Sequence, residues 1–341
     1  MSGDAPSGTS QGDVTPATSP VERYDDGVIA LDTLTGGMHT VTAGFLLTAP
    51  RPALIECGPA RSIRNVIAGL QALGFAPDDL AYVVLTHIHL DHAGGAGDLA
   101  RAFPNATVVV SDVGAPHLHE PERLNASSER VYGPLYDRVY GACTPIERER
   151  MLGVVDGDRL DLGGGRELEL LYTPGHAKHH VGVHDSETGA IFSGDSVGVK
   201  LPGMTHIRPA TPPADFHLEA ALASLARYRE RAPSRVYLAH YGPVDPPDEA
   251  LAEAEERLRL WAATAESAYR HAIAGGPTGT ELDHVAETLR HRFATEFEPE
   301  HVADDPDAER RIELLSGYTS NAAGLLRYFQ RRDAGTLTPV G

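Results

Sequence analysis

The stretch that most constrains this chain is HIHLDH at residues 87–92, which places three imidazoles and one carboxylate within six positions. It follows the apolar run 82–85, which is typical of a short buried strand, and loops at strand ends commonly carry functional side chains. In an extended segment the first two histidines project to the same side, whereas the adjacent Asp91 and His92 diverge. We therefore expect this one stretch to serve two metal ions.

Three later motifs place a residue of the same ligand type at the end of an apolar strand. They are His176 in TPGH, Asp195 in SGD and His240 in AHYG. A lone histidine at such a place is more often structural than a ligand. Several imidazoles and carboxylates together suit a divalent cation such as zinc or iron. The recurrence indicates a metal site assembled from several strand ends.

The composition limits the classes of function. The chain has 341 residues, 41% of them hydrophobic, and a formal net charge of −19. This suits one large globular domain, or one with a smaller second domain. An acidic surface repels polyanions, so nucleic acid is not an expected partner. With two cysteines, no signal peptide and no membrane-length apolar run, the sequence predicts a cytoplasmic protein without a membrane partner.

The pattern of apolar residues divides the chain into parts. Residues 1–22 are rich in small and polar residues and predict a disordered tail. Residues 23–247 alternate strands and helices and form the predicted catalytic domain, with a helical cap over about 113–151. A helical stripe then predicts a C-terminal α-helical domain over residues 248–335. We expect this extension to wall off part of the pocket, to build a homodimer interface, or only to stabilise the protein.

In this order and at these separations, the four motifs resemble the metallo-β-lactamase-fold superfamily of metallohydrolases, over roughly residues 24–245. The resemblance implies an α/β fold, a four-layer αββα sandwich with the metal site on the sheet edges, here with a C-terminal α-helical extension. Carried over residue by residue, it implies one metal held by His87, His89 and His176, a second held by Asp91, His92 and His240, and Asp195 bridging both.

The resemblance also implies a mechanism. Two divalent ions, zinc in the first place and iron or manganese as alternatives, lower the pKa of a shared water and polarise a substrate oxygen. Asp91 is the expected catalytic residue, which orients the resulting hydroxide or passes its proton to the leaving group. The motifs look most like an uncharacterised hydrolase subgroup near glyoxalase II and the lactonases. That subgroup implies a small ester, thioester or lactone as substrate.

Other readings stay open at this point. The aspartate at the bridging position departs from the true β-lactamases, so antibiotic hydrolysis is not the expected activity. The alternative function is a mononuclear iron oxidoreductase resembling the persulfide dioxygenases, and a third is a metal-stabilised binding protein without turnover. Three residues beside the motifs are candidates for substrate binding: His179, Arg208 and Tyr241. Arg208 could hold an acidic group and Tyr241 could donate to an oxyanion, with structural roles as the alternative for all three.

Overall fold

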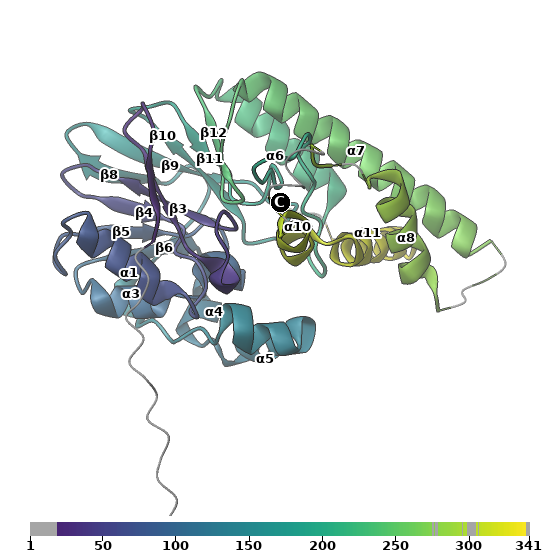
Figure 1. The fold of residues 1–341 in the computed structure, drawn as a ribbon, viewed down its shortest axis with the longest axis horizontal. Helices are drawn as coiled ribbons and strands as arrows, with labels where there is room; N and C mark the ends of the chain where they lie inside the picture. The colour runs from purple at the N-terminus through teal and green to yellow at the C-terminus, as the bar shows by residue number, and fades with distance from the viewer. Residues whose placement is uncertain are drawn as a thin grey trace, which may run out of the picture.

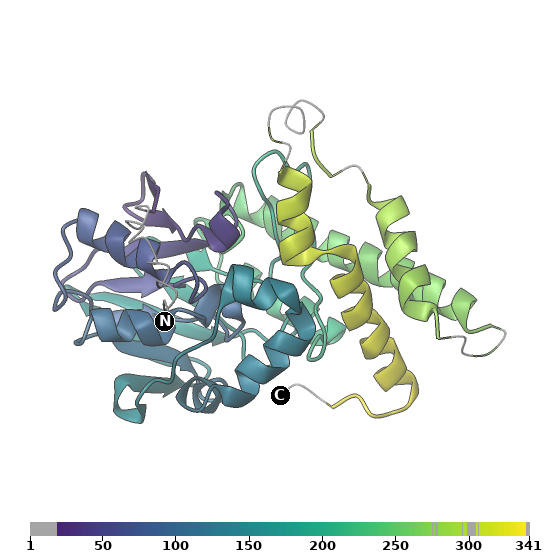
Figure 2. The same ribbon diagram turned by 60° about the horizontal axis from the view of Figure 1, so that its bottom comes forward.

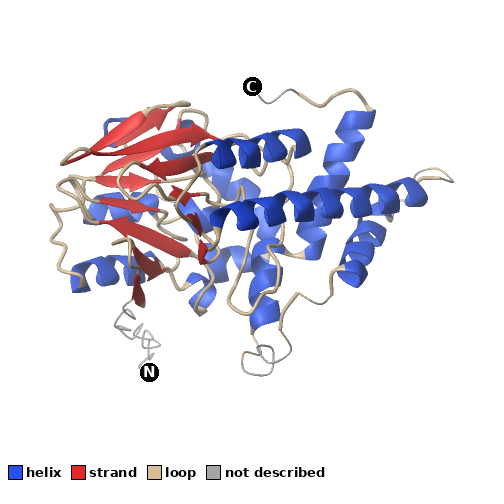
Figure 3. Ribbon diagram, turned by 90° about the horizontal axis from the view of Figure 1, so that it is seen from above, coloured by secondary structure: helices blue, strands red, loops and turns tan. Residues whose placement is uncertain are grey.

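Two mixed β-sheets lie face to face at the centre of the molecule (Figure 3). The computed structural model describes residues 19–274, 276, 279–294, 296–298, 305 and 307–338. In the first sheet, neighbouring strands are antiparallel from β1 to β4 and parallel from β4 to β7. Its strands are β1 (Val21–Arg23), β2 (Ile29–Asp32), β3 (Ala43–Leu47), β4 (Ala53–Ile55), β5 (Tyr82–Val84), β6 (Thr107–Ser111) and β7 (Met151–Val154).

The second sheet has the order β13-β12-β11-β10-β9-β8, with a single parallel pair between β11 and β12. Its strands are β8 (Arg159–Gly163), β9 (Arg166–Tyr172), β10 (Val181–Asp185), β11 (Ile191–Phe192), β12 (Val236–Leu238) and β13 (Gly242–Val244). Helices α1 (Ile63–Ala72) and α3 (Ala96–Ala102) cover the first sheet, and α6 (Leu218–Glu230) and α7 (Pro247–Ala272) cover the second (Figure 1).

Alternating residues of the central strands supply separate cores. In β5, Val83 packs toward α1 and α3, whereas Val84 packs between the two sheets. In β9, Leu170 lies between the sheets and Leu171 packs toward α6 and α7. Because both faces of β5 are buried, its sequence is a continuous apolar run, whereas β9 carries Arg166, Glu167 and Glu169 before its apolar end. The predicted αββα layering is confirmed, and so is the buried strand ahead of residue 87.

Residues 113–151 form a helical cap beside the sandwich. It contains α4 (Ala115–His119), α5 (Glu122–Tyr132), the π-helical turn η2 (Tyr136–Tyr140) and the 3₁₀ turn η3 (Arg148–Arg150). A small apolar cluster of Tyr136, Val139 and Tyr140 joins the cap to the core, and Leu314 of the C-terminal helices packs against it. Figure 2 shows the C-terminal helices beside the cap.

The C-terminal segment is helical, as predicted. After α7 it forms α8 (Glu281–Arg292), α10 (Ala308–Ser316) and α11 (Tyr318–Asp333). Trp261, Leu289 and Leu325 of these helices share one apolar core with α6 and the outer face of the second sheet. The division into a separate domain stays a prediction. None of the helices in the described ranges is long and apolar enough to cross a membrane.

The first described residues differ from the prediction. Residues 1–18 of the expected tail lie outside the described residues, but Ser19 is buried and β1 already begins at Val21. β1 pairs with β2 through its backbone while all three of its side chains are exposed. A strand held only by backbone hydrogen bonds leaves no apolar pattern in the sequence, so the prediction that residues 19–22 belong to the tail is wrong.

Candidate metal centre

The seven predicted metal ligands converge at strand ends of both sheets. The HIHLDH stretch follows β5 of the first sheet, while His176 follows β9, Asp195 follows β11 and His240 follows β12 of the second. These strand ends meet at one edge of the sandwich. Residues that are distant in sequence therefore come within reach of one another.

The backbone of the HIHLDH stretch divides its ligands into two sets. The chain is still extended at His89, with φ −64° and ψ 151°, so the flanking histidines point away from Ile88, which packs in the core. The short helix α2 (Leu90–Ala93) then carries Asp91 and His92. Of the four ligands only His89 is partly exposed.

A glycine brings His176 into the site. Gly175 has φ 131°, and a Cβ atom there would lie 2.3 Å from the backbone of Ala221 in α6. Only glycine combines this backbone conformation with such a close approach. The His217 amide at the start of α6 donates to the Gly175 carbonyl at 2.8 Å. The TPGH turn is thereby docked against α6, and His176 faces inward.

The first group of ligands is His87, His89, His176 and Asp195. The Nε2 atom of His87 and the Nε2 atom of His176 each lie 3.0 Å from Nδ1 of His89. Oδ2 of Asp195 lies 3.4 Å from Nε2 of His176. Three ring nitrogens and a carboxylate oxygen thus point at a common centre.

The second group is Asp91, His92 and His240. The Nε2 atoms of His92 and His240 lie 3.2 Å apart, and Oδ2 of Asp91 lies 3.7 Å from the first and 3.5 Å from the second. Oδ1 of Asp195 is 3.3 Å from each of the two rings. One carboxylate therefore faces both groups, with one oxygen toward each.

Backbone carbonyls orient two of the rings. Nδ1 of His176 lies 3.1 Å from the Ala210 oxygen, and Nδ1 of His240 lies 2.7 Å from the Val41 oxygen. A carbonyl oxygen only accepts hydrogen bonds, so both Nδ1 atoms carry a proton and donate it. In the neutral rings each Nε2 atom keeps a lone pair that faces the other ligands.

The two groups differ in electrostatics. Burial lowers the pKa of His87 well below its ordinary value, and the neighbouring histidines lower it further. Burial also lowers the pKa of His176. At His240, burial is outweighed by the carboxylates of Asp195 and Asp91, which raise the pKa to about 9. The histidines of the first group are therefore neutral. In the second group, the nearby carboxylates stabilise a positive charge placed among the ring nitrogens.

This donor set fits divalent metal ions. Lone pairs of ring nitrogens face each other at hydrogen-bond distance, and Oδ1 of Asp195 has no hydrogen-bond partner among the described residues. Such buried acceptors repel one another unless a cation lies among them. Neutral imidazole and carboxylate are the ligands that zinc and related ions prefer. The ligand atoms of each group lie within 4.8 Å of one another.

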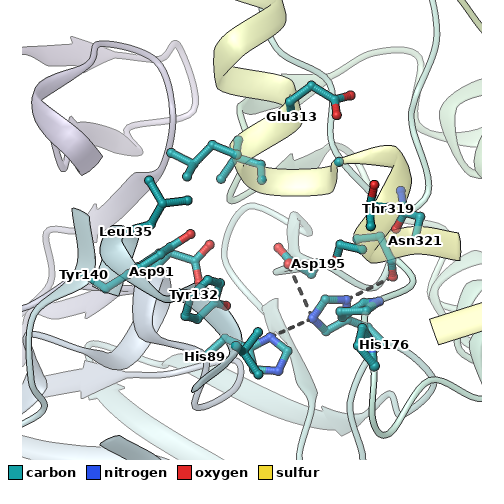
Figure 4. Close-up of a pocket in the computed structure, with 18 residues that line it drawn as sticks. His89, Asp91, Tyr132, Leu135, Tyr140, His176, Asp195, Glu313, Thr319 and Asn321 are labelled. Atoms are coloured by element: carbon teal, nitrogen blue, oxygen red, sulfur yellow. Dashed lines mark hydrogen bonds and ion pairs between the residues drawn. The ribbon is translucent and has the colours of Figure 1, made fainter. Parts of the chain in front are cut away.

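A cavity of about 400 Å³ opens onto these ligands (Figure 4). Four ligands line it: His89, Asp91, His176 and Asp195. The cap contributes Val131, Tyr132, Leu135 and Tyr140, and the C-terminal helices contribute Glu313, Leu314, Leu315, Thr319, Ser320 and Asn321. Figure 4 shows the two tyrosines on the Asp91 side and Asn321 on the His176 side. The C-terminal helices thus wall off part of the pocket.

None of the three predicted substrate-binding residues lines this cavity. Arg208 is 3% exposed and donates hydrogen bonds to Glu296 and Glu313, so its guanidinium is occupied within the protein. Tyr241 lines a separate groove, and the buried ring of His179 is stacked on the ring of His87. Arg208 instead pairs with the buried Glu296 and the exposed Glu313, and the substrate-binding roles of all three residues stay predictions that the lining of this cavity does not support.

The structure adds residues that the sequence does not single out. Glu56 follows β4, is 1% exposed, and places Oε1 3.4 Å from Nδ1 of His92. Its signal is an acid directly after an apolar strand, the same pattern as the ligands. The sequence places Tyr132 in the cap, without a direction for its side chain. Leu314 and Asn321 carry no sequence signal, since only tertiary packing brings their helices to the cavity.

Comparisons with known proteins agree with this site. The fold and the buried histidine and aspartate groups define a metal-dependent hydrolase. The chain belongs to the metallo-beta-lactamase superfamily, whose family model matches residues 36–240. The metallo-beta-lactamase fold-containing protein ST1585 of Sulfurisphaera tokodaii is 34% identical over 220 residues, which are 62% of this chain and 80% of that protein. The N-acyl homoserine lactonase of Bacillus thuringiensis is 28% identical over 49% of this chain and 56% of the lactonase.

Solved structures show the same fold. The crystal structure of ST1585 from Sulfolobus tokodaii has a TM-score of 0.55 at 32% identity, covering 65% of this chain and 80% of that chain. The metallo-beta-lactamase family protein TTHA1429 from Thermus thermophilus has a TM-score of 0.61 at 21% identity, covering 94% of this chain and 92% of that chain. The second likeness extends into the C-terminal helices.

Proposed function

We propose that this protein is a binuclear metal-dependent hydrolase that acts on a small, uncharged ester, thioester or lactone. The charge of the cavity wall carries the proposal. Among the described residues that line the cavity, none is a lysine or an arginine, and the acids are Asp91, Asp195 and Glu313. A carboxylate or phosphate on a substrate would find no cationic side chain there. Anionic substrates are therefore disfavoured.

The proposal assigns the two metal ions as the motifs imply. His87, His89 and His176 hold one ion, Asp91, His92 and His240 hold the other, and Asp195 lies between them. The support is the pair of ligand groups and the position of the two Asp195 oxygens, one toward each group. When bound, divalent ions of this kind lower the pKa of water, so that hydroxide is available as the nucleophile at neutral pH. They also polarise a substrate carbonyl.

Asp91 is the proposed proton carrier. It lines the cavity, and although burial would raise the pKa of its carboxyl, His92 and His240 lower that pKa below its ordinary value. An ionised carboxylate at this place can accept a proton from water and return it to the leaving group.

Tyr132 is the proposed donor to the substrate's acyl oxygen. Its side chain lines the cavity beside Asp91 (Figure 4), and no described residue forms a hydrogen bond with its hydroxyl. A phenol is protonated at neutral pH, and burial raises the pKa of Tyr132 further. A donor without a partner in the free enzyme can stabilise the charge that develops on the oxygen during attack.

The apolar part of the wall suits a hydrocarbon substituent. Leu135, Leu314 and Leu315 line the cavity together with Pro212 and Pro213. Similarity to the N-acyl homoserine lactonases supports lactones as the first substrates to assay. Apolar side chains of this kind, placed beside a few polar groups, suit the hydrocarbon part of a small ligand.

The test uses substrate pairs that differ only in charge. An uncharged lactone and ester are assayed beside analogues that carry one carboxylate on the acyl chain, with a phosphodiester as a further probe. We expect turnover of the uncharged members and a lower kcat/KM for each charged analogue. A preference for the carboxylate analogues, or oxygen uptake on a persulfide by protein that holds one iron, would overturn the proposal.

A further inference from the structure

We propose that the C-terminal helix α11 positions the metal ligand His176 by holding the backbone that orients its imidazole. The backbone in question is the segment 209–212, which follows Arg208 and passes beside the cavity. This inference rests on the metal assignment of the proposed function and extends it. It gives Asn321 and Gly324, which lie outside the family-matched residues 36–240, a part in holding the metal.

The contact at the His176 end is a single hydrogen bond. Nδ1 of His176 donates to the Ala210 oxygen at 3.1 Å, which leaves the Nε2 lone pair facing His89 at 3.0 Å. If Ala210 moves, the ring loses the contact that fixes both its tautomer and its rotation. Partners of this kind orient metal-binding histidines and raise their basicity.

Asn321 holds Ala210 from both sides. The Thr211 amide donates to Asn321 Oδ1 at 2.7 Å, and Asn321 Nδ2 donates to the Pro209 oxygen at 3.1 Å. The Thr211 hydroxyl also donates to the backbone oxygen of Asn321 at 3.1 Å. Asn321 is 1% exposed, so these bonds have no competing water. Removing the side chain leaves the buried Thr211 amide unpaired, while the Pro209 oxygen keeps its bond from the Ser316 hydroxyl at 2.8 Å.

Gly324 allows the helix to reach the same segment. A Cβ atom on Gly324 would lie 2.0 Å from the Thr211 oxygen and 2.7 Å from the carbonyl carbon of Pro212. Positions 321 and 324 share one face of α11, so the side-chain grip and the backbone contact act together. Any larger residue at 324 would push the segment away from the helix.

The helix is a rigid support for these contacts. Leu325 and Phe329 of α11 are buried in the core that α11 shares with α7 and α8. Figure 4 shows Asn321 next to His176 on one side of the cavity. The contacts between α11 and the metal ligands therefore run from Asn321 to the backbone of Pro209 and Thr211, and from the Ala210 oxygen between them to His176.

The experiment measures zinc affinity in Asn321→Ala by competition with a chromogenic chelator. Loss of a group that orients a ligand typically weakens metal binding about 10–100-fold. We expect this loss for one zinc per chain, the one held with His176, while the affinity for the other changes little. The matched control is Asn125→Ala, whose side chain grips the Cys143 backbone in the cap in the same way, at 2.9 and 3.0 Å. Its zinc affinities should equal those of the wild type.

Gly324→Ala is the second variant, because it displaces the segment without deleting a buried hydrogen-bonding group. It should weaken the same zinc, and in ¹⁵N-histidine-labelled protein the proton on Nδ1 of His176 should be lost from the NMR spectrum in both variants. Wild-type affinities in both variants, or equal weakening of both zinc ions, would overturn the inference and leave the proposed function standing. A wild type that binds neither zinc, iron nor manganese would overturn both.

Discussion

Replacing Tyr132 by phenylalanine separates the chemistry of the cavity from its shape. The substitution deletes one hydroxyl that has no hydrogen-bond partner among the described residues, so the free enzyme loses no bond. We expect the free energy of unfolding to stay within about 0.5 kcal/mol of the wild type and the metal content to stay the same. In the transition state, loss of one oxyanion donor costs about 10²–10³-fold in kcat, or about 2.7–4 kcal/mol.

The assay is steady-state hydrolysis of an uncharged lactone, with kcat and KM determined separately. The fall should be in kcat, because the hydroxyl meets charge only as the acyl oxygen becomes negative. Tyr136→Phe is the matched control, since Tyr136 is buried in the same cap and does not line the cavity. A kcat within a factor of about three of the wild type in Tyr132→Phe, or an equal fall in Tyr136→Phe, would refute the assignment of Tyr132.

Three further predictions follow from buried contacts. Arg208→Met leaves Glu296, which is 2% exposed, with Arg257 as its remaining arginine. Urea unfolding should show that the free energy of unfolding falls by about 3–5 kcal/mol. A fall below about 1 kcal/mol would contradict the structural role of Arg208. Asp91→Ala should bind one metal ion fewer per chain by elemental analysis and lose nearly all turnover, and undiminished turnover would exclude Asp91 as proton carrier. Glu56→Ala should weaken binding of the metal held with His92 about 10–100-fold in chelator competition. Unchanged affinity would show that Glu56 has no part in metal binding.

The ligands can be predicted from the sequence because their pattern is local. Each ligand follows an apolar strand, and the resemblance of the motifs to the metallo-β-lactamase fold implies that these strand ends meet, which places His176 and His240 with the HIHLDH stretch. Glu56 fits the same pattern but does not stand out, because a single acid after a strand is common. β1 escapes prediction for a different reason, since its side chains are exposed and its pairing uses only the backbone.

The walls of the cavity cannot be predicted in this way. Leu314 and Asn321 reach it through the packing of α10 and α11 against the cap and the segment 209–212, and helical periodicity shows only which face of a helix is buried, not against what. Arg208 is expected at the substrate because an arginine after a metal motif suits anion binding. The acids that bind it instead, Glu296 and Glu313, lie 88 and 105 residues later in the chain.

The most direct test of the central claim is metal content and activity measured on one sample. Protein purified without added metal is analysed for metal per chain, stripped with a chelator, and assayed on an uncharged lactone before stripping, after stripping and after metal is returned. The account predicts two divalent ions per chain, hydrolysis that disappears with them, and recovery when they are restored. Full hydrolysis by the metal-free protein would contradict it.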